Sequence, residues 1–194
     1  MNIPNYLTFL RILISPIFLV LYIYHEELGI SSTTLPYILL GLLVISELTD
    51  AFDGFLARRY KQVTELGKIL DPLADSIVHI SIFMTFTLEP VRLPLPLVFV
   101  FFYRDSVIST LRTLCALKGF ALSARTSGKI KAVTQAVATF IVLALMIPAS
   151  LGLISNDSLH QVATIVIGLS ALYTAYSGFE YVWANWKYIK ATSV

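Results

Sequence analysis

Six long apolar runs constrain the fold of this chain more than any other feature of its sequence. They cover residues 6–25, 35–57, 65–88, 93–117, 130–153 and 160–184. A helix that crosses a bilayer needs about 20 mostly apolar residues, and its backbone groups must find hydrogen-bond partners within the segment. The runs are continuous and lack the alternation of barrel strands. We therefore predict an all-α, integral membrane bundle of six transmembrane helices, forming a single domain over residues 1–194.

The composition agrees with a membrane protein and argues against other classes. Charged residues make up 13% of the chain and the mean hydropathy is +0.78, whereas soluble domains carry roughly 25% charged residues. The net charge of +2 is too small to indicate nucleic-acid binding, so no nucleic-acid partner is expected. The single cysteine, Cys115, excludes an intramolecular disulfide and a cysteine zinc site, and we expect it to be a packing residue.

The positions of lysine and arginine predict the orientation in the membrane. On one side of the six runs, the loops carry only Arg92. The other side holds eleven basic residues: Arg11, Arg58, Arg59, Lys61, Lys68, Lys118, Arg125, Lys129, Lys131, Lys187 and Lys190. Because basic loops stay in the cytoplasm, we predict cytoplasmic termini and a bacterial inner-membrane location. An interfacial anchor is expected near the end of the last helix, made of Tyr181, Trp183, Trp186 and Tyr188.

Acidic residues interrupt the second and third runs at helical spacing. One helix face would carry Asp50, Asp53, Gly54, Ala57 and Arg58, and a second face would carry Gly67, Asp71 and Asp75. If the two helices are antiparallel, residues whose numbers add to about 125 lie at equal depth, since helical residues share a face at three- and four-residue spacing. The pattern therefore predicts four carboxylates that face one another in a cavity open to the cytoplasm.

Such a cluster needs a counter-charge. Each aspartate at mid-membrane costs roughly 2.5–3.5 kcal/mol, and four of them repel one another. A divalent cation relieves both problems, and all-oxygen ligation favours Mg²⁺ or Mn²⁺ over zinc. The small residues Gly54, Ala57 and Gly67 leave two interpretations open, because they either let helices pack closely or admit a flat ligand beside the metals.

The stretch "DAFDGFLARRYKQVTELGKILDPLAD" resembles the signature of the CDP-alcohol phosphatidyltransferases, Asp-x2-Asp-Gly-x2-Ala-Arg-x8-Gly-x3-Asp-x3-Asp, at all eight fixed positions. The resemblance implies an enzyme that transfers the phosphatidyl group of CDP-diacylglycerol to an alcohol and releases CMP. It also implies a homodimer that works on membrane lipid.

Site residues follow from the same resemblance. It implies that Asp50, Asp53 and Asp71 bind divalent metal, with two ions expected, and that Asp75 lies near the metals and acts as the base. The residues expected to frame the cytidine diphosphate are Gly54, Ala57, Arg58 and Gly67. On the first run, Asn5, Thr8 and Arg11 share a face. That face is either a helix start at the membrane surface, where Arg11 snorkels, or part of the site, with Asn5 contacting CDP-diacylglycerol.

The fourth run and the loop after it carry basic residues that favour an anionic acceptor. Arg104 and Arg112 share a helix face, and Lys129 and Lys131 follow at the start of the fifth helix; cations suit a phosphate. Asp105 and Arg112 are seven residues apart and could instead form an internal ion pair. We predict that the acceptor phosphate is bound by Arg104, Arg112, Lys129 and Lys131.

The pattern Arg-Asp-x6-Arg, then Gly-Lys-x-Lys and Gln135, resembles the branch of the family that makes phosphatidylglycerophosphate from sn-glycerol 3-phosphate. The chain departs from that branch at Ser76, where a lysine is common, and at Ala132, where a threonine is common. Inositol phosphate, inositol and serine therefore remain alternative acceptors.

A cation transporter is the alternative from another class, because carboxylates in membrane helices also bind ions in transit. A conduit needs polar residues across the whole membrane, whereas these acids stop at mid-depth. Two polar neighbours stay open: Glu47 either supports the site or packs between helices, and His79 is expected to be a hydrogen-bonded structural residue.

Overall fold

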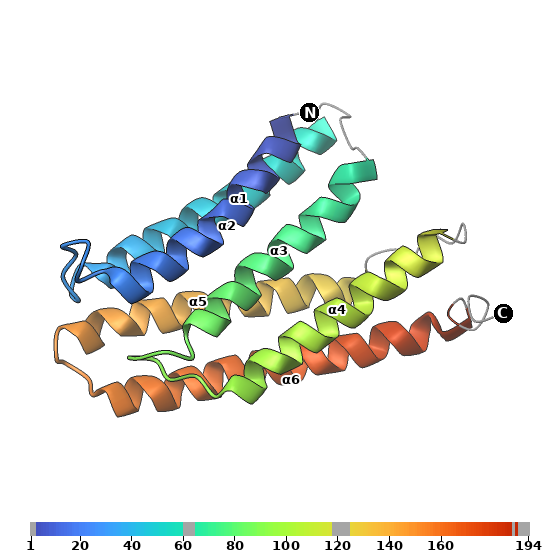
Figure 1. Ribbon diagram of the computed structural model, residues 1–194. Helices are drawn as coiled ribbons and strands as arrows, with labels where there is room; N and C mark the ends of the chain where they lie inside the picture. Colours follow the sequence, from blue (N-terminus) through green and yellow to red (C-terminus); the bar gives the residue numbers. More distant parts are fainter. Residues whose placement is uncertain (1–2, 60–64, 118–124, 188, 190–194) are drawn as a thin grey trace.

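The computed structural model describes residues 3–59, 65–117, 125–187 and 189, although the side chains of residues 3–7, 53–59, 65–70 and 116 lie outside the description. Within these ranges the chain forms six α-helices and no strands. The helices are α1 (Ile3–Tyr24), α2 (Leu35–Arg59), α3 (Glu65–Thr85), α4 (Leu95–Leu117), α5 (Thr126–Ser150) and α6 (Asn156–Ala184). The all-α prediction and the six helices are confirmed, with bounds close to the apolar runs (Figure 1).

Local sequence explains where several helices begin and end. Pro36 lies in the first turn of α2, where its missing N–H leaves no helical hydrogen bond unmade. Ser155 caps α6, and its hydroxyl accepts a hydrogen bond from the backbone N–H of Ser158 at 3.1 Å. Past the end of α5, Gly152 adopts a φ of 72°, which glycine reaches without the penalty of a Cβ.

The helices form two groups. Helix α1 packs against both α2 and α3, while α6 packs against α4 and α5; α2–α5, α3–α4 and α3–α5 contacts join the groups. Within the described residues, the backbones of α2 and α3 are not close neighbours; α1 packs against both helices, and side chains of α2 and α3 meet across the space between them. The two chain ends lie at the same end of the bundle (Figure 1).

Apolar and polar residues divide the bundle along its long axis. Every helix contributes a large, fully buried apolar side chain to one core: Phe18, Leu39, Phe83, Phe101, Leu143 and Ile167. Most of these residues lie toward the helix ends that are joined by the α1–α2, α3–α4 and α5–α6 loops. Buried polar residues such as Arg11, Asp105 and Lys131 belong to the opposite half, near the termini. The interior of the bundle is therefore apolar at one end and polar at the other.

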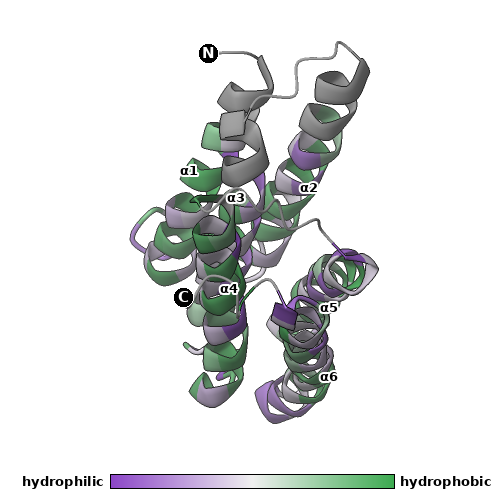
Figure 2. Cartoon of the chain, turned by 90° about the vertical axis from the view of Figure 1, so that its right-hand side faces the viewer, coloured by the Kyte–Doolittle hydropathy of each residue, from purple (hydrophilic) through white to green (hydrophobic). Residues whose placement is uncertain are grey.

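Large apolar side chains also cover the outside of the bundle. Leu172, Phe179 and Trp183 are 70%, 72% and 75% exposed, and Figure 2 shows hydrophobic residues along the helices rather than confined to an interior. Such a surface is unusual for a soluble monomer. In the described part of the chain, three segments are long and apolar enough to cross a membrane: Leu35–Phe52, Thr126–Ser150 and Asn156–Ala184. These segments support an integral membrane protein.

One part of the predicted interfacial anchor is wrong. Tyr181 is only 1% exposed, because it lies on the side of α6 that faces α4 and accepts a hydrogen bond there. Trp183 and Trp186 are exposed as predicted, and Tyr188 lies outside the described residues. Cys115 is fully buried, as expected of a packing residue.

Candidate active site

Helix α1 connects the acidic residues of its two neighbours. Thr8 and Arg11 lie one turn apart and are buried. The Thr8 hydroxyl donates a hydrogen bond to Asp71 Oδ1 at 3.0 Å, and Arg11 Nη1 forms an ion pair with Asp50 Oδ1. Arg11 therefore does not snorkel to the surface, and this face of α1 is turned toward Asp50 and Asp71. The side chain of Asn5 lies outside the described part of the chain.

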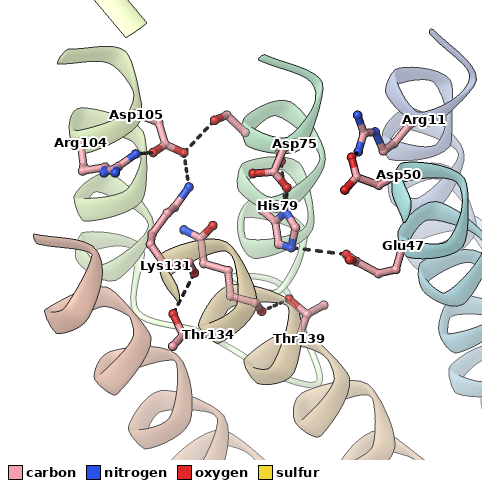
Figure 3. Close-up of polar contacts among 12 residues, drawn as sticks. Arg11, Glu47, Asp50, Asp75, His79, Arg104, Asp105, Lys131, Thr134 and Thr139 are labelled. Atoms are coloured by element: carbon pink, nitrogen blue, oxygen red, sulfur yellow. Dashed lines mark hydrogen bonds and ion pairs between the residues drawn. The ribbon is translucent and has the colours of Figure 1, made fainter. Parts of the chain in front are cut away.

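His79 links two more carboxylates across the gap between α2 and α3 (Figure 3). Its Nε2 lies 3.7 Å from Glu47 Oε1, and its Nδ1 lies 3.3 Å from Asp75 Oδ1 and 3.1 Å from the Asp75 carbonyl oxygen. The Glu47–His79 contact has the antiparallel register that the sequence predicted, in which Asp50 and Asp75 lie at similar depth. The interpretation of His79 as a hydrogen-bonded residue is confirmed, and Glu47 is brought near Asp75 through it.

The donor chemistry of this cluster fits a hard divalent cation. Asp50, Asp71 and Asp75 make the contacts above through one oxygen each, and a carboxylate has two oxygens with about four acceptor sites. The side chains of Asp50 and Asp75 remain 49% and 29% exposed. Oxygen ligands of this kind suit Mg²⁺ or Mn²⁺.

A complete metal-binding group is not present among the described side chains, where no three His, Cys, Asp or Glu residues are gathered closely enough to hold an ion. The side chain of the predicted ligand Asp53 is not among those that the structure describes. The same is true of the residues predicted to frame the cytidine diphosphate, Gly54, Ala57, Arg58 and Gly67, whose backbone is helical. Their roles stay predictions.

The second charged cluster centres on Asp105, which is 7% exposed. Its Oδ2 accepts hydrogen bonds from Lys131 Nζ and from the hydroxyl of Ser76, both at 2.9 Å. Its Oδ1 accepts one from Arg104 Nη1, also at 2.9 Å. One carboxylate thus ties α3, α4 and α5 together and holds two cations. The alternative pair of Asp105 with Arg112 is not formed, because Asp105 points toward α3 and α5.

Arg112 faces α6 instead. Its Nε donates a hydrogen bond to the Tyr181 hydroxyl at 3.1 Å, and its guanidinium carbon lies 5.2 Å from the centre of the Tyr181 ring. Arg104 also lies against α6, where a Cβ on Gly178 would come within 2.8 Å of Arg104 Cγ. The two arginines therefore share a helix face, as predicted. Lys129 is exposed, so the structure gathers Arg104 and Lys131 but not all four predicted cations.

Sequence reasoning missed three polar partners. Ser76 follows Asp75 directly, and its spacing from His79 could have placed it on the inner side of α3. Glu180 forms an ion pair with Arg125 at 2.6 Å and accepts a hydrogen bond from Ser127 at 2.5 Å, and a lone acid in an apolar helix could have signalled it. Nothing in the pattern of α6, which has several tyrosines, distinguished Tyr181.

Comparison with known proteins identifies the family of this chain. Residues 1–176 match the family described as CDP-alcohol phosphatidyltransferase. A protein of Bacillus subtilis (strain 168) is 30% identical over 201 residues, which cover 99% of both chains. A protein of Rickettsia bellii (strain RML369-C) is 33% identical, with 96% of this chain and 97% of the relative covered. Both are named CDP-diacylglycerol--glycerol-3-phosphate 3-phosphatidyltransferase. The chain belongs to the CDP-alcohol phosphatidyltransferase family.

Proposed function

We propose that this protein transfers the phosphatidyl group of CDP-diacylglycerol to sn-glycerol 3-phosphate, giving phosphatidylglycerophosphate and CMP in phospholipid biosynthesis. The observation that carries the proposal is similarity, over nearly the full length, to relatives that bear the name of this reaction. The aspartates of α2 and α3 and the cations of α4 and α5 supply the two kinds of charge that such a reaction needs.

The acidic cluster holds the donor end of the reaction. Asp50, Asp53, Asp71 and Asp75 bind two divalent ions, Mg²⁺ or Mn²⁺. Ions held by these aspartates would supply positive charge that neutralises the diphosphate and the attacking and leaving oxygens. Arg11 and Thr8 orient Asp50 and Asp71 through the contacts described above. CDP-diacylglycerol is contacted by Asn5, Gly54, Ala57, Arg58 and Gly67.

Asp75 is the catalytic base. The acceptor's hydroxyl oxygen attacks the phosphorus that carries the diacylglycerol, and a new phosphorus–oxygen bond forms. The bond between that phosphorus and the oxygen bridging to CMP breaks, and CMP leaves with its electrons. The hydroxyl proton passes to a carboxylate oxygen of Asp75, which is accessible and is held in place by His79. Proton transfer to a positioned carboxylate contributes to such rates by about 10²–10⁴-fold.

The basic cluster binds the phosphate of the acceptor. Lys131 and Arg104 both pair with Asp105. Because two positive charges face one negative charge, this group has a net charge of about +1. Arg112 and Lys129 add charge from the α6 side and from the surface. A phosphorylated acceptor suits this surplus better than serine or inositol does.

The membrane setting completes the proposal. All six helices of the single domain, residues 1–194, span the bacterial inner membrane, with both termini and the site on the cytoplasmic side. The common location of the two chain ends (Figure 1) and the excess of basic residues at that end support this orientation. The protein works as a homodimer, which the family resemblance implies and sedimentation in detergent would test.

The deciding experiment measures CMP release by the purified protein from CDP-diacylglycerol with Mg²⁺. Glycerol 3-phosphate, inositol phosphate, inositol and serine are supplied separately, and EDTA serves as the metal-free control. We expect release only with glycerol 3-phosphate and only with the metal. A preference for an uncharged acceptor would overturn the assignment of Arg104, Arg112, Lys129 and Lys131.

A further inference from the structure

Gln135 is a buried amide for which the described part of the protein supplies no partner. Its side chain is 1% exposed, and neither Nε2 nor Oε1 has a hydrogen-bond partner. Buried polar side chains are almost always hydrogen-bonded, and an unpaired buried group costs about 1–3 kcal/mol. Thr139, one turn further along the same face, satisfies its own hydroxyl by donating to the Gln135 carbonyl at 2.9 Å. The side-chain amide of Gln135 therefore needs a separate explanation.

Contacts between α3 and α5 fix the level of Gln135 in the bundle. Ser76 of α3 and Lys131 of α5 donate to the same oxygen of Asp105, so these two residues lie at one level. Helices α3 and α5 run in the same direction and pack together (Figure 1). His79 follows Ser76 by three residues, about 4.5 Å along α3, and Gln135 follows Lys131 by four residues, about 6 Å along α5, so His79 and Gln135 lie at similar depth.

His79 is the second polar group at this level. It is 3% exposed, and its Nε2 has no hydrogen-bond partner, since the nearest Glu47 oxygen is 3.7 Å away. In Figure 3, His79 lies over the stretch of α5 between Lys131 and Thr139. Three helices thus place Glu47, His79 and Gln135 one turn deeper than Asp50, Asp75 and Lys131. These three polar side chains form a layer directly beyond the charged residues.

We propose that Gln135 binds the non-reacting hydroxyl of the acceptor alcohol. The inference rests on the proposed function, in which Lys131 and Arg104 hold the acceptor phosphate and Asp75 takes the proton of the reacting hydroxyl. A three-carbon acceptor that joins these two points carries its middle hydroxyl between them. An amide offers one donor and one acceptor group, which matches a hydroxyl that does both. Gln135 is then a specificity-determining residue.

The test compares two acceptors in the presence of CDP-diacylglycerol and Mg²⁺. Glycerol 3-phosphate has the middle hydroxyl, whereas 3-hydroxypropyl phosphate keeps the primary hydroxyl and the phosphate but lacks it. For the unmodified protein, we expect kcat/KM to fall about 10- to 100-fold with the second acceptor, because its use leaves a buried amide unpaired. In Gln135→Met, a similar-sized apolar replacement, glycerol 3-phosphate should lose that advantage and the two acceptors should react at nearly equal rates.

Thr139→Val is the matched control, because it alters a buried side chain on the same face whose hydroxyl bonds only within its own helix. It should keep the acceptor ratio of the unmodified protein. If Gln135→Met does not fold, Gln135→Asn withdraws the amide by one methylene and should reduce the ratio.

The possible results are distinguishable. An acceptor ratio in the Gln135 variants equal to that of the unmodified protein would overturn the role of Gln135 and leave the proposed function intact. No release of CMP from the unmodified protein with glycerol 3-phosphate would overturn the proposed function and this inference together.

Discussion

The two charged clusters of this protein are balanced in different ways. On the α1–α3 side, the side chains that the structure describes place Glu47, Asp50, Asp71 and Asp75 around the guanidinium of Arg11 and the imidazole of His79. On the α4–α6 side, the carboxylate of Asp105 is accompanied by Arg104 and Lys131. The exposures differ as well, because the side chains of Asp50 and Asp75 are 49% and 29% exposed and that of Asp105 is only 6% exposed.

We infer that the two clusters have different roles: Asp105 stabilises the fold, whereas the carboxylates of the acidic cluster bind a ligand. Asp105 is buried and makes three hydrogen bonds, as a stable buried charge must. The acidic side keeps accessible carboxylates in excess over cations, which favours a bound metal, and the basic side keeps one surplus cation, which favours a phosphate. Substitutions on the acidic side should therefore change activity, while removal of Asp105 should change stability.

The largest expected effect on activity is that of Asp75→Asn. The amide cannot accept the hydroxyl proton, so CMP release with saturating glycerol 3-phosphate should fall about 10²–10⁴-fold. The temperature of unfolding in EDTA should change little, because asparagine has the same size and keeps an oxygen that can accept a hydrogen bond from His79 Nδ1. Activity assays measure the rate of CMP release, and thermal unfolding in detergent measures the stability.

Asp157→Asn is its control, since Asp157 is exposed at the start of α6, where it pairs with Arg92 at 2.6 Å. This variant should keep full activity. An active Asp75→Asn protein would mean that Asp75 is not the base.

The next effect is on stability. Asp105→Asn leaves the buried Lys131 and the partly exposed Arg104 without their counter-charge, and breaking a buried ion pair costs about 3–5 kcal/mol of unfolding free energy. Thermal or denaturant unfolding in detergent measures the loss. The double variant Asp105→Asn/Lys131→Met removes one stranded cation as well and should recover part of it. If the single variant is as stable as the unmodified protein, Asp105 does not stabilise the fold, and the contrast between the two clusters is wrong.

The sequence predicted the helices and the acidic register because both depend on periodicity. Apolar runs gave bounds close to those of the six helices, and the antiparallel spacing anticipated the Glu47–His79 contact. It did not predict that α1 packs against both α2 and α3, because spacing within a helix carries no information about which helix is its neighbour. The bridging roles of Thr8 and Arg11 depend on that packing.

The partners of Asp105 could not be predicted for a related reason. Asp105 and Arg112 are two turns apart on one helix, a spacing that puts both on similar faces without bringing them into contact. Lys131 and Ser76 reach Asp105 from other helices, and only the tertiary packing places them there. Residues such as Asp53 and Arg58, predicted by resemblance alone, remain predictions.

The smallest effect is expected where the basic cluster meets α6. Tyr181→Phe removes the hydroxyl that accepts from Arg112 Nε at 3.1 Å but keeps the ring under the guanidinium. We expect the unfolding free energy to fall by about 1 kcal/mol, the value of one buried hydrogen bond. The KM for glycerol 3-phosphate should rise a few-fold with kcat nearly unchanged, because Arg112 is less well oriented toward the acceptor phosphate.

Tyr176→Phe makes the same chemical change on the same helix at a side chain that is 60% exposed, and it should alter neither quantity. If Tyr181→Phe lowers stability but leaves the KM for glycerol 3-phosphate unchanged, Arg112 serves only to join α4 to α6. The phosphate would then be held by Arg104 and Lys131 around Asp105, and the basic cluster would combine its structural and binding roles in one buried group of charges.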